Sequence, residues 1–282
     1  NVIYKIASKA LANRLKLILP HIISEEQSAF VPGRLITDNF ISAYECLHFM
    51  KTRKLKGNMY CALKLDMMKA YDRLEWNYLE RVMLKLGIGP LFTQKVMRCV
   101  TSVSFSVIFN GGKQEEFRPS RGLRQGDPIS PYLFLLAAEG LSCLLKSTRS
   151  NERIQGIMVA AGAPQVNNLL FADDSIFFAR SDNRSVEALK YALRQYCDDS
   201  GQNINLQKSS IFFGKHCPDG VKVTVKGYLG VDNEILHDSY LGMPTEIGRQ
   251  PPTLLVSCLT GSGRGSMAAI IDRCRVLERK FC

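Results

Sequence analysis

Two adjacent carboxylates, Asp173 and Asp174, stand between the apolar runs Asn168–Phe171 and Ser175–Phe178. Each run is typical of a short buried strand, and the Asp pair falls where a tight turn would join them. Two carboxylates ~4 Å apart repel by ~4 kcal/mol at an effective dielectric of about 20, so a divalent cation would find a binding site there. The alternative is a hairpin turn whose two aspartates lie in water.

A third carboxylate, Asp66, ends the strand-like run that begins at Tyr60 and precedes a helical pattern. Asp66 could join Asp173 around a cation, and the backbone carbonyl of Met67 could add a ligand. Oxygen-only ligands suit Mg²⁺ or Mn²⁺ better than zinc. Two such ions ~3.5–4 Å apart could activate a 3′-hydroxyl and stabilise a leaving pyrophosphate. A helix N-cap or a turn is the alternative role for Asp66.

A basic, glycine-containing stretch lies between these carboxylates in the sequence, from Pro119 to Ser130. Asp127 followed by Pro128 predicts a helix that begins at Pro128, because proline suits the first helical position. Arg121 and Arg124 place positive charge beside the amino end of that helix, which suits a phosphate. A basic loop capping a core helix is the alternative, but it does not explain why arginine, glutamine and two glycines gather here.

Taken together, these motifs resemble a reverse transcriptase, of the kind found in plant non-LTR (LINE-type) retrotransposons. The motifs, in family order, are Leu65-Asp66 to Tyr71-Asp72, Arg124-Gln125-Gly126-Asp127-Pro128-Ile129-Ser130-Pro131 and Phe171-Ala172-Asp173-Asp174. Three flanking segments are also similar to that family, namely residues 24–34, residues 200–209 and Tyr240–Pro244. The resemblance covers roughly residues 1–250.

The resemblance implies catalytic roles for individual residues. Asp66 and Asp173 would be the principal metal ligands and Asp174 would complete the acidic trio, with the Met67 carbonyl as a further ligand. The implied cofactor is Mg²⁺ or Mn²⁺. Lys208 would donate a proton to pyrophosphate, a task that suits an ammonium group near phosphates; a solvated lysine is the alternative.

The resemblance also implies the substrate contacts. Tyr71 would be the steric gate whose ring blocks a ribose 2′-hydroxyl, and the nucleotide pocket would be lined by Arg124, Gln125 and Gly126. Leu241 and Gly242 fall in the primer-grip region. The expected partners are an RNA template, a DNA primer and dNTPs; no membrane partner is expected, and no oligomeric state is indicated.

The expected fold is α+β: the palm of a right-hand polymerase, a ferredoxin-like antiparallel sheet with helices on one face, plus partial fingers. Residues 1–58 would be the helical partial fingers, residues 59–250 the palm with the primer-grip region, and residues 251–282 an atypical tail. The local patterns predict helices over 2–19, 39–54, 75–86, 91–99, 128 onward and 185–200, strands over 60–66 and 211–214, a hairpin over 103–118 and the Asp-Asp hairpin.

Composition agrees with a polyanion partner. The chain has 37 Lys and Arg against 26 Asp and Glu, a net charge of +11, and cations that neutralise phosphates release counterions. Its nine cysteines form no Cys-x-x-Cys pair, which argues against zinc and favours free thiols in a reducing, intracellular compartment, nuclear or cytoplasmic. No apolar run approaches the ~18 residues that a membrane helix needs.

Both ends are expected to be incomplete relative to the family pattern. The family's upstream fingers hairpin and its flanking endonuclease and RNase H regions are missing from these 282 residues. Allowed codons for the tail, read in a displaced frame, yield SRFLPDRVWKRVNG and then SRAGKEVL, which resemble the family's continuation. We therefore expect a frameshift near Gln250 to make residues 251–282 a non-native peptide, a hypothesis that the source DNA tests.

The sequence is compatible with three functions. The first is an RNA-directed DNA polymerase domain, a nucleotidyltransferase that adds dNTPs to a primer 3′-hydroxyl. The second is a decayed copy that binds nucleic acid without catalysis. The third is another palm-fold enzyme, such as a nucleotidyl cyclase, against which the Arg124–Pro131 block and the Asp-Asp hairpin argue.

Overall fold

The computed structural model of the chain describes residues 2–52, 59–150, 153–160, 162–234 and 240–241. Its elements, in chain order, are α1 (Val2–Ile22), α2 (Ile36–Thr52), β1 (Tyr60–Leu65), α3 (Ala70–Arg73), α4 (Trp76–Lys85), α5 (Pro90–Thr101), β2 (Ile108–Phe109), β3 (Gly112–Lys113), α6 (Ser130–Ser150), β4 (Asn168–Phe171), β5 (Asp174–Arg180), α7 (Asn183–Ser200), β6 (Ser210–Phe213) and α8 (Asp219–Leu229).

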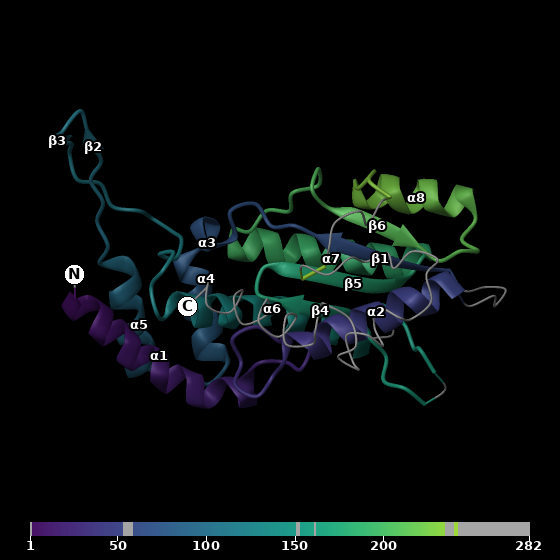
Figure 1. Ribbon diagram of the computed structural model, residues 1–282, viewed down its shortest axis with the longest axis horizontal. Coiled ribbons are helices and arrows are strands. Elements are labelled where there is room, and N and C mark those ends of the chain that lie inside the picture. Colours follow the sequence, from purple (N-terminus) through teal and green to yellow (C-terminus); the bar gives the residue numbers. More distant parts are fainter. Residues whose placement is uncertain (1, 53–58, 151–152, 161, 235–239, 242–282) are drawn as a thin grey trace, which may run out of the picture.

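A four-stranded sheet in the order β4-β5-β1-β6 forms the centre of the molecule (Figure 1). Every neighbouring pair of strands is antiparallel. The first strand therefore lies between the third and the fourth, which is the ferredoxin-like arrangement for a β-α-β-β-α-β order. The expectation of an antiparallel palm sheet is confirmed.

Successive side chains of each strand point to opposite faces of the sheet, so both faces carry apolar residues. On one face, Leu63 and Phe177 belong to the main core, with residues of α6 and α7. On the other, Ala62 and Phe178 pack with α2 and Tyr240 in a second cluster. The two palm helices α6 and α7 therefore lie on one face of the sheet, as expected. The opposite face is covered by α2, which comes from the segment expected to form partial fingers.

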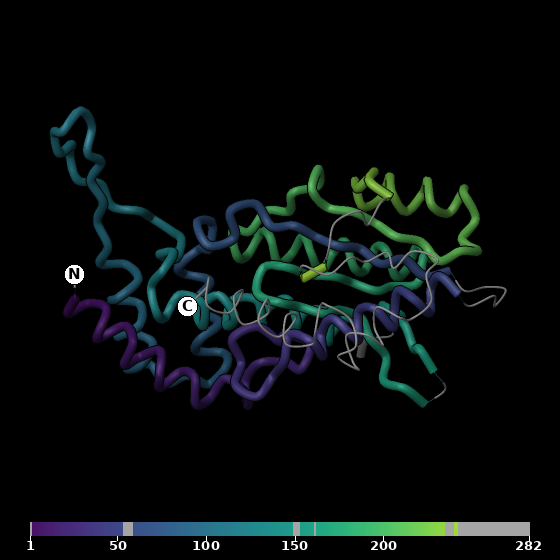
Figure 2. The backbone as a smooth tube through the Cα atoms, in the orientation of Figure 1, coloured from purple at the N-terminus to yellow at the C-terminus, as the bar shows by residue number. Residues whose placement is uncertain are grey.

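Helices α1, α4 and α5 form one end of the molecule, where α1 and α4 contact α6 (Figure 1). The connection from α5 runs out to the small β2–β3 hairpin, which projects from the body and returns toward the start of α6 (Figure 2). The hairpin was predicted over residues 103–118, but its two regular strands, β2 and β3, have only two residues each. An isolated bridge between Phe105 and Phe117 continues the pairing beyond them.

Helix α1 ends later than the sequence predicted. Pro20 was expected to stop the helix, but α1 continues to Ile22. A distant side chain holds the turn that follows the helix: the Arg34 guanidinium donates to the carbonyls of Ile23 (2.7 Å), Ser24 and Gln27 (2.5 Å each). These three carbonyls lie just beyond α1, whose last turn is closed by the bond from the Ile23 N–H to the Leu19 carbonyl (2.9 Å).

Two other helix starts differ from the sequence prediction. Helix α2 begins at Ile36, so Thr37 and Asp38 lie in its first turn. Helix α6 begins at Ser130, two residues after the predicted start at Pro128. Among the described residues, no helix is long and apolar enough to cross a membrane.

Candidate active site

The sheet register brings the three aspartates together. Strands β1 and β5 pair from Tyr60 opposite Arg180 to Leu65 opposite Ser175. Asp66 follows Leu65 and Asp174 precedes Ser175, so both lie at the same end of the strand pair, with Asp173 in the adjoining hairpin turn. Residues separated by more than a hundred positions therefore meet at one end of the sheet, as the sequence motifs predicted.

The carboxylates disfavour one another's charge. Partial burial raises the pKa of Asp174 to about 6, and Asp173 and Asp66 add to the rise while Lys64 opposes it. Burial also raises the pKa of Asp173, to which Asp66 contributes. Both side chains still reach solvent, so their hydration is reduced by surrounding protein but not lost. Repelling oxygen donors open to solvent suit a divalent cation.

The turn of the hairpin is held by Gln27, a residue whose role the sequence patterns did not reveal. Ala172 has a left-handed backbone with φ 54°, a conformation that costs energy for a residue with a Cβ. The Gln27 side chain is buried, and its carbonyl oxygen accepts from the N–H groups of Ala172 (3.1 Å) and Ala29 (3.0 Å). In the sequence, only the similarity of residues 24–34 to the family pattern pointed to this residue.

Asp66 is supported from the other side by the segment that follows α7. The Asn205 N–H donates to the Asp66 carbonyl (2.8 Å), and the Met68 N–H donates to the Asn203 carbonyl (2.8 Å). Ser209 Oγ lies 3.3 Å from the Asp66 amide nitrogen, which donates to it. Lys208 stands in this segment with an exposed side chain, so the structure brings its backbone near Asp66.

Tyr71 lies on α3 with its ring stacked on Phe134 of α6, at 5.0 Å between centroids and 8° between planes. Its side chain is half-buried. Burial raises the pKa of the Tyr71 hydroxyl, and the Asp173 carboxylate raises it further. The predicted gate residue therefore lies beside the Asp-Asp turn.

The predicted nucleotide residues occupy the loop before α6. Arg124, Gln125 and Gly126 are all exposed, and Gly126 has a φ of 79° that suits glycine. The Leu123 N–H, one residue earlier, donates to the Tyr71 carbonyl (2.7 Å). This bond joins the loop to the helix that carries Tyr71.

The predicted primer-grip region is described only in part. Tyr240 is buried against the sheet, and its hydroxyl donates to Asn39 Oδ1 on α2 (2.8 Å). Asn39 in turn donates to the Leu170 carbonyl on β4 (2.9 Å), so one buried amide links α2, β4 and this segment. Leu241 follows with a positive φ of 52°, whereas Gly242 and residues 251–282 lie outside the described part of the chain.

Within the described residues, no group of three His, Cys, Asp or Glu side chains forms a metal cage. Mg²⁺ does not require one, since it usually takes one or two protein carboxylates and completes its shell with water and substrate phosphates. Asp66 and Asp173 offer hard oxygen donors of that kind, and the mutual repulsion around Asp174 would be relieved by a cation. The residues present therefore fit such an ion.

Residues 1–242 match the sequence profile of the family described as reverse transcriptase (RNA-dependent DNA polymerase). The chain belongs to the reverse transcriptase family. The matched region contains β1, the loop before α6 and the Asp-Asp hairpin, so the three motifs belong to a single family domain.

Proteins of mobile elements are among the relatives of this reverse transcriptase domain. A transposon TX1 protein of 149 kDa from Xenopus laevis is 33% identical over 207 residues, which are 73% of this chain and 15% of that protein. A Pol polyprotein of the retrotransposable element R2 from Popillia japonica is 24% identical over 84% of this chain and 32% of the polyprotein. An uncharacterized mitochondrial protein of Arabidopsis thaliana is 53% identical over 68 residues, 24% of this chain and 56% of that protein.

A solved structure has the same fold as this reverse transcriptase domain. Telomerase from Candida tropicalis, in a complex with a TWJ fragment of telomeric RNA, superposes with a TM-score of 0.52 at 14% identity. The match covers 90% of this chain and 40% of the telomerase chain. The expected polymerase palm fold is thereby confirmed.

Proposed function

We propose that this domain is the RNA-directed DNA polymerase of a plant non-LTR, LINE-type retrotransposon. Its substrates would be dNTPs, a DNA primer and an RNA template. The observation that carries the proposal is the β1–β5 register, which brings Asp66 to the same end of the sheet as Asp173 and Asp174, near Tyr71. The R2 and TX1 relatives support a retrotransposon, and the Arabidopsis relative supports a plant source.

The division into lobes is part of this proposal. Residues 1–58 would serve as partial fingers and residues 59–250 as the palm and primer-grip region. The contacts of α1 support it, because α1 packs against α5 and α6. Helix α2 would join the two lobes, because it packs on the sheet that carries the aspartates.

Asp66, Asp173 and Asp174, with the Met67 carbonyl, would hold Mg²⁺ or Mn²⁺. A bound ion of this kind activates an attacking hydroxyl and stabilises a leaving oxygen. The Tyr71 ring would exclude a 2′-hydroxyl, and Arg124, Gln125 and Gly126 would contact the nucleotide. The exposed Lys208 would give a proton to the leaving pyrophosphate, and Leu241 and Gly242 would contact the primer.

The test is primer extension on an RNA template with Mg²⁺, comparing the wild type with Asp66→Ala and Asp173→Ala. Both variants should lose all measurable extension, because each lacks a carboxylate that the cation requires. Asp198→Ala removes an exposed carboxylate at the end of α7 and serves as the control. A wild type that binds RNA and primer without extending it would instead identify a nucleic-acid-binding copy without catalysis.

A further inference from the structure

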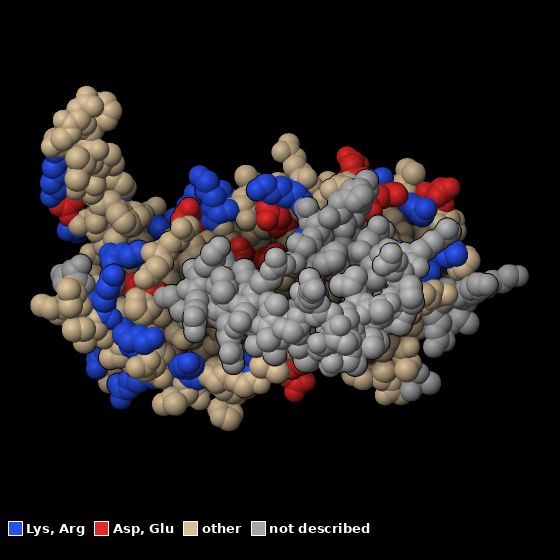
Figure 3. Space-filling view, viewed as in Figure 1, with Lys and Arg blue, Asp and Glu red and all other residues tan. Residues whose placement is uncertain are grey.

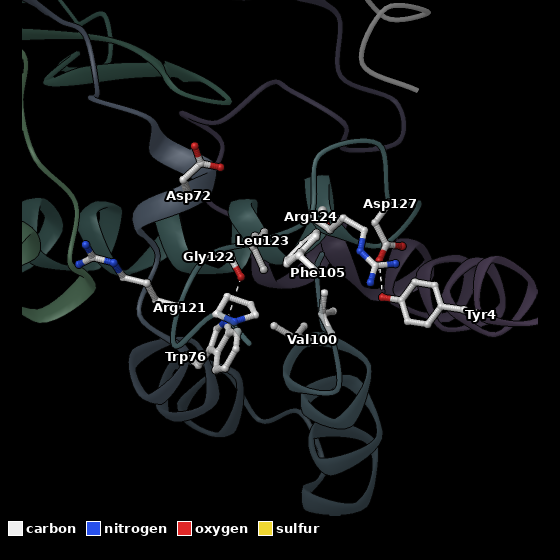
Figure 4. A pocket seen from close by; sticks show the side chains of 13 residues that line it. Tyr4, Asp72, Trp76, Val100, Phe105, Arg121, Gly122, Leu123, Arg124 and Asp127 are labelled. Carbon is white, nitrogen blue, oxygen red and sulfur yellow. Dashed lines mark hydrogen bonds between the residues drawn. The ribbon is translucent and has the colours of Figure 1, made fainter. Parts of the chain in front are cut away.

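The loop from Arg121 to Ile129 is attached at its first half to α3 and α4. The Gly122 N–H donates to the Leu74 carbonyl (2.8 Å), and the Leu123 N–H donates to the Tyr71 carbonyl (2.7 Å). The Trp76 indole N–H donates back to the Gly122 carbonyl (2.8 Å) (Figure 4). Three bonds therefore fix this half relative to the helix that carries Tyr71.

The second half is attached to α1. Asp127 is buried, and its carboxylate accepts hydrogen bonds from the Tyr4 and Ser8 hydroxyls, which lie one helical turn apart on the same face of α1. The Arg124 guanidinium lies 4.6 Å from the centroid of the Tyr4 ring, a favourable cation–π contact. Figure 4 shows Tyr4, Arg124 and Asp127 converging at one side of the loop.

Local contacts alone hold this half weakly. Its local hydrogen bonds are long: the Ile129 N–H donates to Asp127 Oδ1 at 3.5 Å, the Asp127 N–H to the Arg124 carbonyl at 3.4 Å and the Ser130 N–H to the Asp127 carbonyl at 3.2 Å. The loop borders a hollow of about 230 Å³ whose lining includes Val100 and Phe105, so it is not packed solidly against a core. Between the anchors, Gln125 and Gly126 are exposed, and no described residue hydrogen-bonds the Gln125 side chain.

We propose that Tyr4 and Ser8 are positioning residues, which set the nucleotide affinity of the domain by fixing the loop of Arg124, Gln125 and Gly126 through Asp127. This inference rests on the proposed function for the identity of the ligand, a dNTP. A loop that is ordered before binding loses less conformational entropy when it binds. Helix α1 thus contributes to nucleotide binding through contacts on the loop.

Hydrogen exchange tests the anchor without any catalysis. Tyr4→Phe keeps the ring over Arg124 and removes only the hydroxyl, and Ser8→Ala removes the second donor. The double variant should exchange the amides of Asp127, Ile129 and Ser130 at least tenfold faster, since bonds to charged groups contribute more than neutral ones. The amides of Gly122 and Leu123, which α3 holds, should keep the wild-type rate. Amides of β4 and β5 should be unchanged. Equal acceleration everywhere, or none in the loop, would overturn the anchoring role.

The chain offers a closely matched control in Tyr228. Its hydroxyl donates to the Glu187 carboxylate (2.8 Å), and Lys190 lies 5.1 Å from its ring centroid. Tyr228→Phe therefore removes the same kind of bond from a residue that also makes a cation–π contact, on α8. It should leave exchange in residues 122–130 at the wild-type rate.

Nucleotide affinity supplies the second measurement. Trp76 is the chain's one tryptophan, and it bonds the loop itself, so its fluorescence reports on a titration with dTTP and Mg²⁺. The Tyr4→Phe, Ser8→Ala double variant should raise the Kd for dTTP about tenfold, while RNA–primer affinity stays unchanged. Unaltered dTTP affinity in a folded variant would overturn the proposal.

Extension assays separate this inference from the proposed function. In an active domain, the double variant should raise KM for dTTP about as much as Kd and change kcat less, because Tyr4 and Ser8 do not touch the reacting atoms. A wild-type domain that binds dTTP but never extends a primer would contradict the proposed polymerase function. The Kd ratio would still decide whether α1 positions the nucleotide loop.

Discussion

The half-buried ring of Tyr71 packs against the main core. Phe134 stacks on one face, and the Tyr71 backbone carbonyl accepts from Leu123. The hydroxyl is close enough to Asp173 for that carboxylate to raise its pKa. A ring held in this way beside the Asp-Asp turn supports the proposed role of Tyr71 as a steric gate.

Tyr71→Ala should therefore raise the incorporation of ribonucleotides relative to deoxyribonucleotides in a primer-extension assay. The variant should also lose about 3 kcal/mol of stability, as truncated aromatics do. Tyr71→Phe is the control, because it keeps the ring and should keep the discrimination. Unchanged sugar selectivity in folded Tyr71→Ala would show that Tyr71 serves packing alone.

Asp174 makes the metal-free domain sensitive to pH. Its folded pKa of about 6 lies above the ordinary 3.8, chiefly through burial and then through Asp173. The folded state therefore binds the proton more tightly than the unfolded state does. The stability that Asp174 contributes is present at low pH and is lost as pH rises from about 4 to about 6.

Asp174→Asn should remove this dependence. At pH 7.5 without Mg²⁺ we expect the variant to be more stable by about 1 kcal/mol, a value reduced for the side chain's exposure, and at pH 4 we expect no difference. Urea unfolding at the two pH values measures it, with Asp198→Asn as control. A variant less stable than the wild type at pH 7.5 would contradict the expected sign.

At the scale of elements, two glycines of one loop have different tasks. Gly122 has a φ of 91°, and a Cβ there would lie 2.7 Å from the Asp72 carbonyl oxygen. Gly126 has a φ of 79°, but a Cβ there would meet nothing within 4 Å. Gly122 therefore permits the close approach of the loop to α3, while Gly126 needs glycine only for its backbone angle.

Gly122→Ala should lower the free energy of unfolding more than Gly126→Ala. Both substitutions place alanine in a left-handed conformation at a cost of roughly 1–2 kcal/mol, and only the first adds a clash that costs roughly a further 1–3 kcal/mol. Chemical denaturation of the two variants gives the comparison directly. Equal losses would mean that α3 can move away from the loop without cost.

Elements with strong local patterns were predictable from the sequence. Helix α7 begins within two residues of its expected start and ends at Gly201 in the left-handed conformation expected of a C-cap, and β1 ends one residue before Asp66. The contacts that adjust the site were not predictable, because they join distant positions. Arg34 binds the carbonyls of the turn that follows α1, and the Asp127 carboxylate accepts a hydrogen bond from Tyr4 on α1.

At the scale of the whole molecule, charge is distributed unevenly. Helices α1 and α5 pack together and contain no Asp or Glu, yet they carry six exposed cations, namely Lys5, Lys9, Arg14, Lys16, Lys95 and Arg98. Figure 3 shows Lys and Arg gathered over the α1 end of the molecule. No described acidic side chain pairs with any of the six. On α8, by contrast, Lys222 and Lys226 pair with Asp219 and Glu234.

Unpaired cations bind phosphates without first breaking an ion pair, so α1 should dominate the salt dependence of RNA binding. Each phosphate contact on a single strand contributes about −0.7 to the slope of log K against log salt. Replacing Lys5, Lys9 and Lys16 with Gln should flatten that slope by about 2 for a single-stranded RNA. The matched control replaces three lysines that already have partners, Lys190, Lys222 and Lys226. Fluorescence anisotropy across a salt series gives both slopes, and equal changes in the two triple variants would show that RNA does not prefer the α1 surface.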